Sequence, residues 1–287
     1  MKPARFSYEA PETIEDALAS LASRGDDAKL IAGGQSLAPM LNMRLARPAH
    51  LIDINGLKGL GGIERDGERL SIGAMVRHAA LARNEQVLRH CPMLAHAAAT
   101  IGHYAIRQRG TIGGSLAHAD PAAQLPLVAL ALDAQIELRS AAGTRMVPAR
   151  AFFVSIFTTV VTPDELIVGV HVPLAKPGQG WGFRLFNRRA GDFAIVSVAA
   201  TLTREDDTIR DLRLAMGGIA PVPVRVENLI GADVAGRLSQ QWSTRVATAV
   251  ADTVDIEDNE RTPIEFRREL VAALTKDVLD QALENAQ

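Results

Sequence analysis

Two short glycine-rich segments hold the residues of this chain that are best suited to bind a ligand. The first glycine segment consists of Ala32, Gly33, Gly34, Gln35 and Ser36. It stands between a strand-like run and a helix-like run, residues 29–31 and 37–45, so its amides are expected to converge at the start of a helix, where they attract phosphate. Because its spacing matches neither the dinucleotide fingerprint nor the phosphate loop, the segment alone is also compatible with a tight turn.

The second glycine segment repeats this arrangement further along the chain as a glycine-rich loop. It consists of Thr111, Ile112, Gly113, Gly114 and Ser115. Two such segments can hold one pyrophosphate from both sides, because glycine lets ligand oxygens approach the backbone. We expect the following pair, Asp120 and Pro121, to begin a helix with Asp120 as its N-cap. The alternative role of Asp120 is a hydrogen bond to a ligand hydroxyl.

Other kinds of site find little support in the sequence. His118 and Asp120 are two potential metal ligands, whereas a zinc site needs three or four, so we expect no metal. Cys91 is the single cysteine, so this chain alone builds neither a disulfide nor an iron–sulfur cluster. Scattered histidines are usually structural or exposed, and this description applies to His50, His78, His90, His96, His103 and His171.

The composition is that of an ordinary globular protein, with 47% hydrophobic and 22% charged residues. Lys and Arg total 31 against 33 Asp and Glu, and the net charge of -2 gives no electrostatic reason to expect nucleic acid or an anionic membrane as partner. No apolar run approaches the roughly 18 residues of a membrane span, and the first residues lack the apolar stretch of a signal peptide. We therefore expect a cytoplasmic protein without a membrane span.

The elements that must position the glycine segments show mixed α/β patterns. Helical periodicity follows Thr13, a strand is expected at residues 51–54, and a glycine cluster marks a boundary near residue 57. In the next stretch, expected helices alternate with expected strands at residues 76–82, 93–101 and 124–132, and at 70–72, 135–138 and 166–172. A linker containing proline and glycine then marks a boundary near residue 177.

The last stretch changes character. Three β-branched runs, residues 182–188, 194–203 and 208–216, predict a small antiparallel sheet. Helical periodicity then includes Val246 and Val250 and returns at residues 264–283. The predicted domains are therefore residues 1–57, 58–177 and 178–287.

A series of motifs covers nearly the whole chain in a fixed order, at residues 32–45, 50–55, 72–75, 106–115, 119–121, 188–193 and 215–221. Together they resemble the FAD-binding medium subunit of molybdenum hydroxylases, in the family of aerobic carbon monoxide dehydrogenase and xanthine dehydrogenase. The resemblance implies an α+β protein with an FAD-binding fold of the vanillyl-alcohol-oxidase (PCMH) type. Two α/β sub-domains of this fold bind FAD, and a C-terminal domain of antiparallel sheet and helices follows.

The resemblance also implies which residues bind FAD. The glycine segments hold the pyrophosphate and neighbouring groups through amides and hydroxyls, Asp120 binds ribityl or ribose hydroxyls, and Lys29 adds positive charge. Two strand residues line the cofactor and an aromatic residue lies near the flavin ring. The implied cofactor-binding residues are Lys29, Ala32, Gly33, Gly34, Gln35, Ser36, Leu37, Thr111, Ile112, Gly113, Gly114, Ser115, Asp120, Leu166, Ile167, Leu185 and Phe193. No side chain is expected to be catalytic, because the flavin is the redox centre.

One position departs from the family pattern Phe-x-Lys-x-x-Arg-Arg, in which the lysine approaches the pyrimidine side of the flavin. This chain has Leu185 in place of that lysine. Arg184 is its neighbour, but successive side chains of a strand point to opposite faces, so Arg184 is not expected to replace the cation. We expect the reduced flavin to be less stabilised, and its reduction potential to be lower, than in relatives with the lysine.

The family context implies a three-subunit molybdenum hydroxylase, as a heterotrimer or a dimer of heterotrimers. A large molybdopterin subunit hydroxylates carbon monoxide, an aldehyde, a purine or another N-heteroaromatic compound, and a small subunit carries 2Fe-2S clusters. This chain is expected to take electrons from those clusters and to pass them from FAD to an external acceptor. The alternatives are a stand-alone FAD-dependent oxidase or dehydrogenase of the same fold, and a non-catalytic protein that has lost the cofactor.

Overall fold

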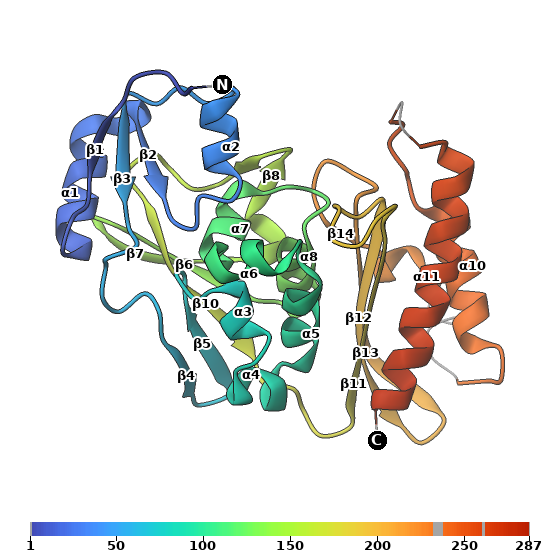
Figure 1. Cartoon of the computed structure of the whole chain (residues 1–287). Helices are drawn as coiled ribbons and strands as arrows, with labels where there is room; N and C mark the ends of the chain where they lie inside the picture. The colour runs from blue at the N-terminus through green and yellow to red at the C-terminus, as the bar shows by residue number, and fades with distance from the viewer. Residues whose placement is uncertain (1, 232–237, 260–261, 287) are drawn as a thin grey trace.

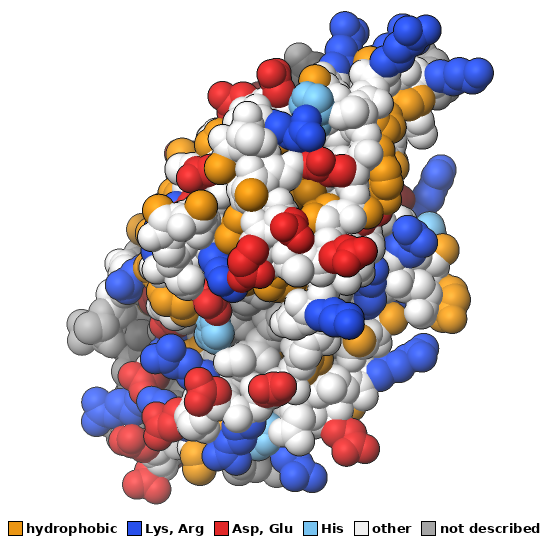
Figure 2. All heavy atoms as spheres, turned by 90° about the vertical axis from the view of Figure 1, so that its left-hand side faces the viewer, with side chains coloured by type: hydrophobic (Ala, Val, Ile, Leu, Met, Phe, Trp, Pro, Cys, Tyr) orange, Lys and Arg blue, Asp and Glu red, His pale blue; other side chains and the backbone are white. Residues whose placement is uncertain are grey.

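The computed structural model describes residues 2–231, 238–259 and 262–286. The strands among these residues form three larger sheets, which follow one another from left to right in Figure 1, and one two-stranded sheet. Acidic and basic side chains are intermixed on the face shown in Figure 2. Within the described residues, no helix is both long enough and apolar enough to cross a membrane.

The first sheet lies at the N-terminal end and is parallel. Its order is β1–β3–β2, with the bounds Ser7–Glu9, His50–Asp53 and Ala28–Ile31. Helix α1 begins after Thr13, whose hydroxyl accepts a hydrogen bond from the Asp16 amide at 3.1 Å and so satisfies a donor that the helix leaves free. The apolar face of α1 packs on Ile52 of the sheet. The helical elements here are α1 (Ile14–Arg24), η1 (Gly25–Asp27) and α2 (Leu37–Asn42).

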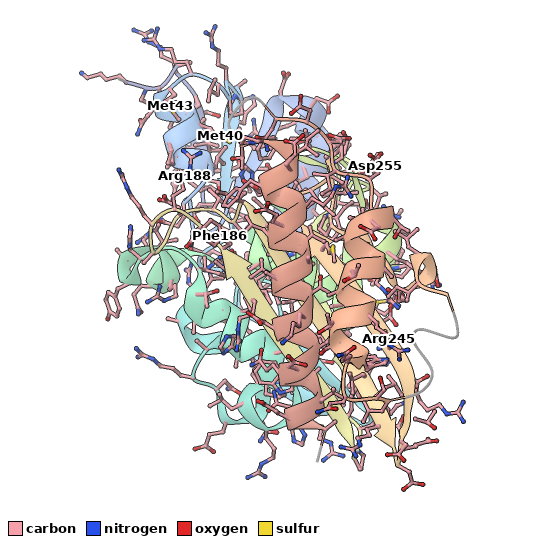
Figure 3. All side chains as sticks on the ribbon, turned by 90° about the vertical axis from the view of Figure 1, so that its right-hand side faces the viewer. Met40, Met43, Phe186, Arg188, Arg245 and Asp255 are labelled. Carbon is pink, nitrogen blue, oxygen red and sulfur yellow. The ribbon has the colours of Figure 1, made fainter. Side chains whose placement is uncertain are left out.

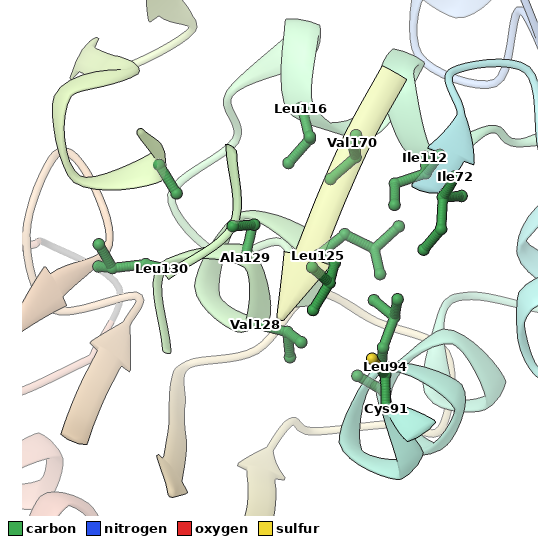
Figure 4. Packing of buried hydrophobic residues seen from close by; sticks show 14 of the residues in the cluster. Ile72, Cys91, Leu94, Ile112, Leu116, Leu125, Val128, Ala129, Leu130 and Val170 are labelled. Carbon is green, nitrogen blue, oxygen red and sulfur yellow. The ribbon is translucent and has the colours of Figure 1, made fainter. Parts of the chain in front are cut away.

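The second sheet is antiparallel and forms the centre of the molecule. Its order is β4–β5–β10–β6–β7, with the bounds Ile63–Asp66, Arg69–Gly73, Leu166–Pro173, Gln135–Ser140 and Gly143–Pro148. Helices cover one of its faces (Figure 1): α3 (His78–Leu81), α4 (Glu85–His90), α5 (Pro92–Thr100), α6 (Tyr104–Arg109), α7 (Ile112–His118) and α8 (Gln124–Ala131). Figure 4 shows the apolar core between sheet and helices, which includes Ile72, Leu125 and Val170. The adjoining short elements are η2 (Ala149–Ala151), β8 (Phe153–Ser155) and β9 (Thr158–Thr159).

The third sheet, β11–β12–β13–β14, is antiparallel and belongs to the C-terminal part of the chain. Its strands span Gln179–Phe186, Val196–Glu205, Thr208–Gly217 and Val224–Arg225, followed by η3 (Glu227–Leu229), α10 (Trp242–Thr253) and α11 (Ile264–Asn285). Helix α11 lies directly on β11, because a Cβ at Gly182 would stand only 2.9 Å from the Val278 carbonyl carbon. This sheet separates the two C-terminal helices from α8 (Figure 1).

The structure confirms the helix after Thr13 and the C-terminal antiparallel sheet. Two local expectations are wrong. The second glycine segment is not a loop, because it forms the beginning of α7. Asp120 is not a helix N-cap, because α8 begins only at Gln124; its carboxylate accepts a hydrogen bond from the Ala122 amide at 2.9 Å and closes a turn instead.

Candidate functional site

The two glycine segments lie against each other, although they come from different parts of the chain. A Cβ at Gly33 would stand 2.8 Å from the Arg109 carbonyl carbon and 2.9 Å from the Gly110 Cα atom. On the other side of the contact, a Cβ at Gly114 would lie 3.9 Å from the Ala32 Cβ atom. Glycine at position 33 therefore allows a backbone-to-backbone contact that any side chain would separate.

The first glycine segment presents free hydrogen-bond donors. Within the described residues, the backbone N–H groups of Gly33, Gly34, Gln35 and Ser36 donate no hydrogen bond. The Gln35 side chain donates to the Gly33 carbonyl at 2.8 Å and thereby orders the segment. Consecutive free amides are suited to receive an anionic oxygen, because each unpaired donor gains a partner when such a group binds.

The second glycine segment uses its amides differently. Those of Ile112 and Gly113 donate to the carbonyls of Val76 and Ala74 at 3.0 and 2.8 Å. The amides of Gly114 and Ser115 donate to the Thr111 hydroxyl and carbonyl, at 3.1 and 3.0 Å. Since the amides of residues 112–115 have acceptors within the protein, the half-buried Ser115 hydroxyl is the group of this segment that can turn to a ligand.

His78 forms hydrogen bonds to the start of the second glycine segment, a role that its isolated position in the sequence did not indicate. Its amide donates to the Gly110 carbonyl, and its ring Nε2 lies 3.0 Å from the Thr111 carbonyl oxygen. Burial lowers the pKa of His78 to about 4. The ring is therefore neutral near pH 7, and Nε2 must carry the proton to donate to the carbonyl.

The predicted residues Lys29 and Asp120 lie in one neighbourhood with His118. Burial lowers the pKa of His118, the Asp120 carboxylate opposes this change, and the Lys29 ammonium adds to it, so both charges act on the imidazole. The His118 ring also lies over Phe157, with 4.9 Å between the ring centroids. Phe157 is exposed and has φ 55°, a backbone conformation that is unusual for a bulky residue.

Two predicted strand residues are in the interior. Leu166 and Ile167 begin β10 and are only 2% and 5% exposed. Leu166 belongs to the apolar core beneath the first sheet, and Ile167 belongs to the core of the second sheet. These two neighbouring residues therefore connect the apolar core of the N-terminal part with that of the central part.

The remaining predicted residues lie in the C-terminal part. Leu185 packs on the central core, whereas Arg184 turns to α11 and donates to the Gln281 side chain at 2.7 Å. The two side chains thus point to opposite faces, as strand geometry predicts. Phe193 is 59% exposed and lines an open pocket of about 180 Å³ together with Arg188 and Ile195. Figure 3 shows Arg188 and Phe186 on the same side of the molecule as Met40 and Met43, which lie at the end of α2.

The structure also joins a serine, a histidine and a carboxylate that are far apart in the sequence. The Ser71 hydroxyl lies 2.9 Å from His171 Nδ1, and His171 Nε2 lies 2.9 Å from Glu137 Oε2. These residues occupy the neighbouring strands β5, β10 and β6. Both edges of β5 and β10 are paired in the sheet, so their backbone amides are engaged and do not form an oxyanion site beside Ser71. We assign this row a structural role.

In the part of the chain that the structure describes, no group of three or more His, Cys, Asp or Glu side chains is placed to hold a metal ion. Cys91 is buried in the central core, and burial raises the pKa of its thiol to about 12. The free amides of the first glycine segment are therefore the groups best suited to bind a ligand, and such amides favour an anionic oxygen.

Comparison with known proteins gives the class of that ligand. Residues 4–175 match the family model described as the FAD binding domain in molybdopterin dehydrogenase. Residues 181–282 match the model of the CO dehydrogenase flavoprotein C-terminal domain. The two matches leave a short gap around the linker between the second and the third sheet.

Two curated relatives illustrate the similarity. The 6-hydroxypseudooxynicotine dehydrogenase complex subunit alpha of Paenarthrobacter nicotinovorans is 39% identical over 288 residues, covering 100% of this chain and 97% of the relative. The carbon monoxide dehydrogenase medium chain of Hydrogenophaga pseudoflava is 39% identical over 227 residues, covering 79% of each chain.

Among solved structures, a chain of the Hydrogenophaga pseudoflava carbon monoxide dehydrogenase that lacks the Mo-pyranopterin moiety superposes with a TM-score of 0.94. It shares 33% identity, and the match covers 99% of both chains. The two chains therefore share the same overall fold.

Proposed function

Because this chain belongs to the family of FAD-binding medium subunits of molybdenum-dependent dehydrogenases, we propose that it is the electron-transfer subunit of a three-subunit molybdenum hydroxylase. In this role it receives electrons from the 2Fe-2S clusters of a small subunit and passes them to an external acceptor. A large molybdopterin subunit hydroxylates the substrate. FAD supplies the redox chemistry when bound, and the protein positions and tunes it.

The observation that carries the proposal is the free row of amides in the first glycine segment, directly beside the second segment. These donors fit the oxygens of a pyrophosphate, and the Ser115 hydroxyl is available from the other side. Lys29 supplies positive charge, and Asp120 binds ribityl or ribose hydroxyls. We further propose that Leu37, Leu166, Ile167, Leu185 and Phe193 border the rest of the cofactor.

The partner subunits follow from the same family membership. Relatives are named as a medium chain and as a subunit of a dehydrogenase complex. A 2Fe-2S cluster needs four protein ligands, normally cysteines, and this chain contains one cysteine, which is buried. The clusters must therefore come from another chain. A heterotrimer or a dimer of heterotrimers accommodates all three subunits.

We propose the domain division 1–57, 58–177 and 178–287, with FAD bound by the first two domains. The three larger sheets support it, because their strands lie at residues 7–53, 63–173 and 179–225. The ranges of the two family models support the second boundary. The cytoplasmic location stays a prediction.

The visible absorption spectrum of the affinity-tagged chain, purified gently from its native host, tests the function. Flavin bands overlaid by iron–sulfur absorption, with one smaller and one much larger protein on a gel, are the expected result. Flavin bands on a single polypeptide would instead establish the alternative, a stand-alone FAD-dependent oxidase or dehydrogenase. A colourless protein would overturn both.

A further inference from the structure

A pair of side chains bridges the two glycine segments. Asn55 follows β3 in the N-terminal part of the chain, and Arg77 precedes α3 in the central part. The Arg77 guanidinium donates to Asn55 Oδ1 at 2.7 Å, and its other terminal nitrogen donates to the Arg109 carbonyl beside the second glycine segment. Neither residue belongs to a glycine segment itself.

Asn55 uses both the donor and the acceptor end of its side-chain amide group. Its Nδ2 donates to the Ala32 carbonyl at 2.7 Å and to Asp53 Oδ1 at 2.6 Å, while its Oδ1 accepts from Arg77. Two N–H donors and an acceptor on one planar group are available only from Asn and Gln. Aspartate at this position would keep the acceptor for Arg77 and lose both donors.

The backbone of Arg77 pairs with the second glycine segment. It forms an isolated antiparallel bridge with Thr111. On either side of it, the Ile112 amide donates to the Val76 carbonyl, and the His78 amide donates to the Gly110 carbonyl. The backbone of Arg77 is therefore fixed to the second glycine segment, and only its side chain reaches across to the first.

Asp53 completes the bridge on the N-terminal side. Its carboxylate accepts from the Tyr8 hydroxyl at 2.6 Å and from the Asn55 amide at 2.8 Å. The positive charges of Arg77 and Arg109 and the negative charge of Asp53 act on one another here, so the carboxylate offsets one of the two arginines. The bridge thus leaves net positive charge next to the free amides, which favours an anion there.

We propose that Asn55 and Arg77 are positioning residues that fix the spacing of the two glycine segments and thereby set the affinity for FAD. This inference rests on the proposed function, because it assumes that both segments contact one FAD molecule. The Gly33 contact makes the spacing critical, since the two backbones touch and a small displacement misaligns donors on one side of the ligand from those on the other.

The test is titration of FAD into the cofactor-depleted full chain, with its partner subunits if they accompany it, at a temperature where every variant is folded. Asn55→Ala, Asn55→Asp and Arg77→Gln each remove part of the bridge and should raise the FAD dissociation constant about fivefold to tenfold. Arg77→Lys keeps the charge but lacks the two separate terminal nitrogens with which Arg77 reaches its two acceptors, so it should give an intermediate value.

Arg225→Gln is the matched control. Arg225 also joins two parts of the chain, because its guanidinium on β14 donates to the Asp133 carboxylate at 2.9 Å. It does not contact either glycine segment. It should lower the thermal stability without changing the FAD affinity.

Coupling between the two positions separates positioning from general destabilisation. Because Asn55 and Arg77 act through one bridge, the double variant Asn55→Ala with Arg77→Gln should lose less affinity than the product of the single losses. FAD binding by the variants at the wild-type affinity, or fully multiplicative losses, would overturn the inference. Failure of the wild-type chain to bind FAD would instead overturn the proposed function.

Discussion

The contact at Gly33 allows a direct test of how closely the glycine segments must approach. In the Gly33→Ala protein, the new methyl group would lie 2.8 Å from the Arg109 carbonyl carbon and 2.9 Å from the Gly110 Cα atom, whereas ordinary contact begins at 3.4 Å. The obstructing atoms are backbone atoms, so no rotamer change relieves the overlap. The two segments must separate by at least about half an ångström.

The expected cost has two parts. Overpacking of this kind destabilises by about 1–3 kcal/mol, which corresponds to a decrease in Tm of a few degrees for a chain of this size. The separation also misaligns the free amides of residues 33–36 relative to Ser115, so we expect FAD affinity to fall at least about tenfold, or about 1.4 kcal/mol. Thermal unfolding of the cofactor-depleted protein and titration of that protein with FAD measure the two parts separately.

Gly56→Ala provides the control for the loss of a glycine. Gly56 lies in the same N-terminal part, has no positive φ, and a Cβ there would meet nothing within 4 Å. Its replacement should leave the unfolding free energy within about 0.5 kcal/mol and the FAD affinity unchanged. If Gly33→Ala behaved like Gly56→Ala in both measurements, the backbone contact would not set the geometry of the site and the reasoning would be refuted.

Three further outcomes are expected from single residues. Leu185→Lys should raise the midpoint potential of the bound flavin in a redox titration, and an unchanged potential would reject the effect assigned to the missing cation. Burial holds the pKa of His78 at about 4 against an ordinary 6.5, so the folded protein binds fewer protons than the unfolded chain between these values. The contribution of neutral His78 to stability is therefore complete above pH 6.5 and is lost as the pH falls towards 4. In denaturant unfolding, the free energy of unfolding of His78→Gln should change less steeply with pH than that of the wild type, and an identical slope would contradict the assignment. Because burial raises the pKa of Cys91 to about 12, iodoacetamide should label it far more slowly in the folded protein than in denaturant, and equal rates would show that the thiol is accessible.

Local sequence signals predicted the elements that depend on neighbouring residues. The cap at Thr13 and the helical period after it predicted α1, because capping and periodicity act within one helical turn. The β-branched runs around the turn at Asp206 predicted β12 and β13 for the same reason. The prediction of a helix start at Pro121 failed, because proline suits a turn as well as the first position of a helix. The helix begins only at Gln124.

The contacts around the site depend on residues that are distant in the sequence. The sequence showed two glycine segments of similar composition, and the resemblance to the family implied that both contribute to an FAD site. It did not show that the amides of residues 112–115 are already paired, because their acceptors include Ala74 and Val76. It also gave no sign of the bridge between Asn55 and Arg77, since neither residue is distinctive by itself.

The division between the two kinds of information has a physical basis. Residue types, caps and hydrophobic periods act over a few residues, so the amino-acid sequence determined the position of most elements, and its resemblance to a known family implied the class of fold and the chemical type of the ligand. The packing of the three sheets and their helices sets the remaining features. These are the donors that stay free, the side chains that bridge the segments and the approach of Gly33 to Arg109. Only the tertiary structure decides these, because a hydrogen bond forms only where the donor and acceptor atoms are placed to within a few tenths of an ångström.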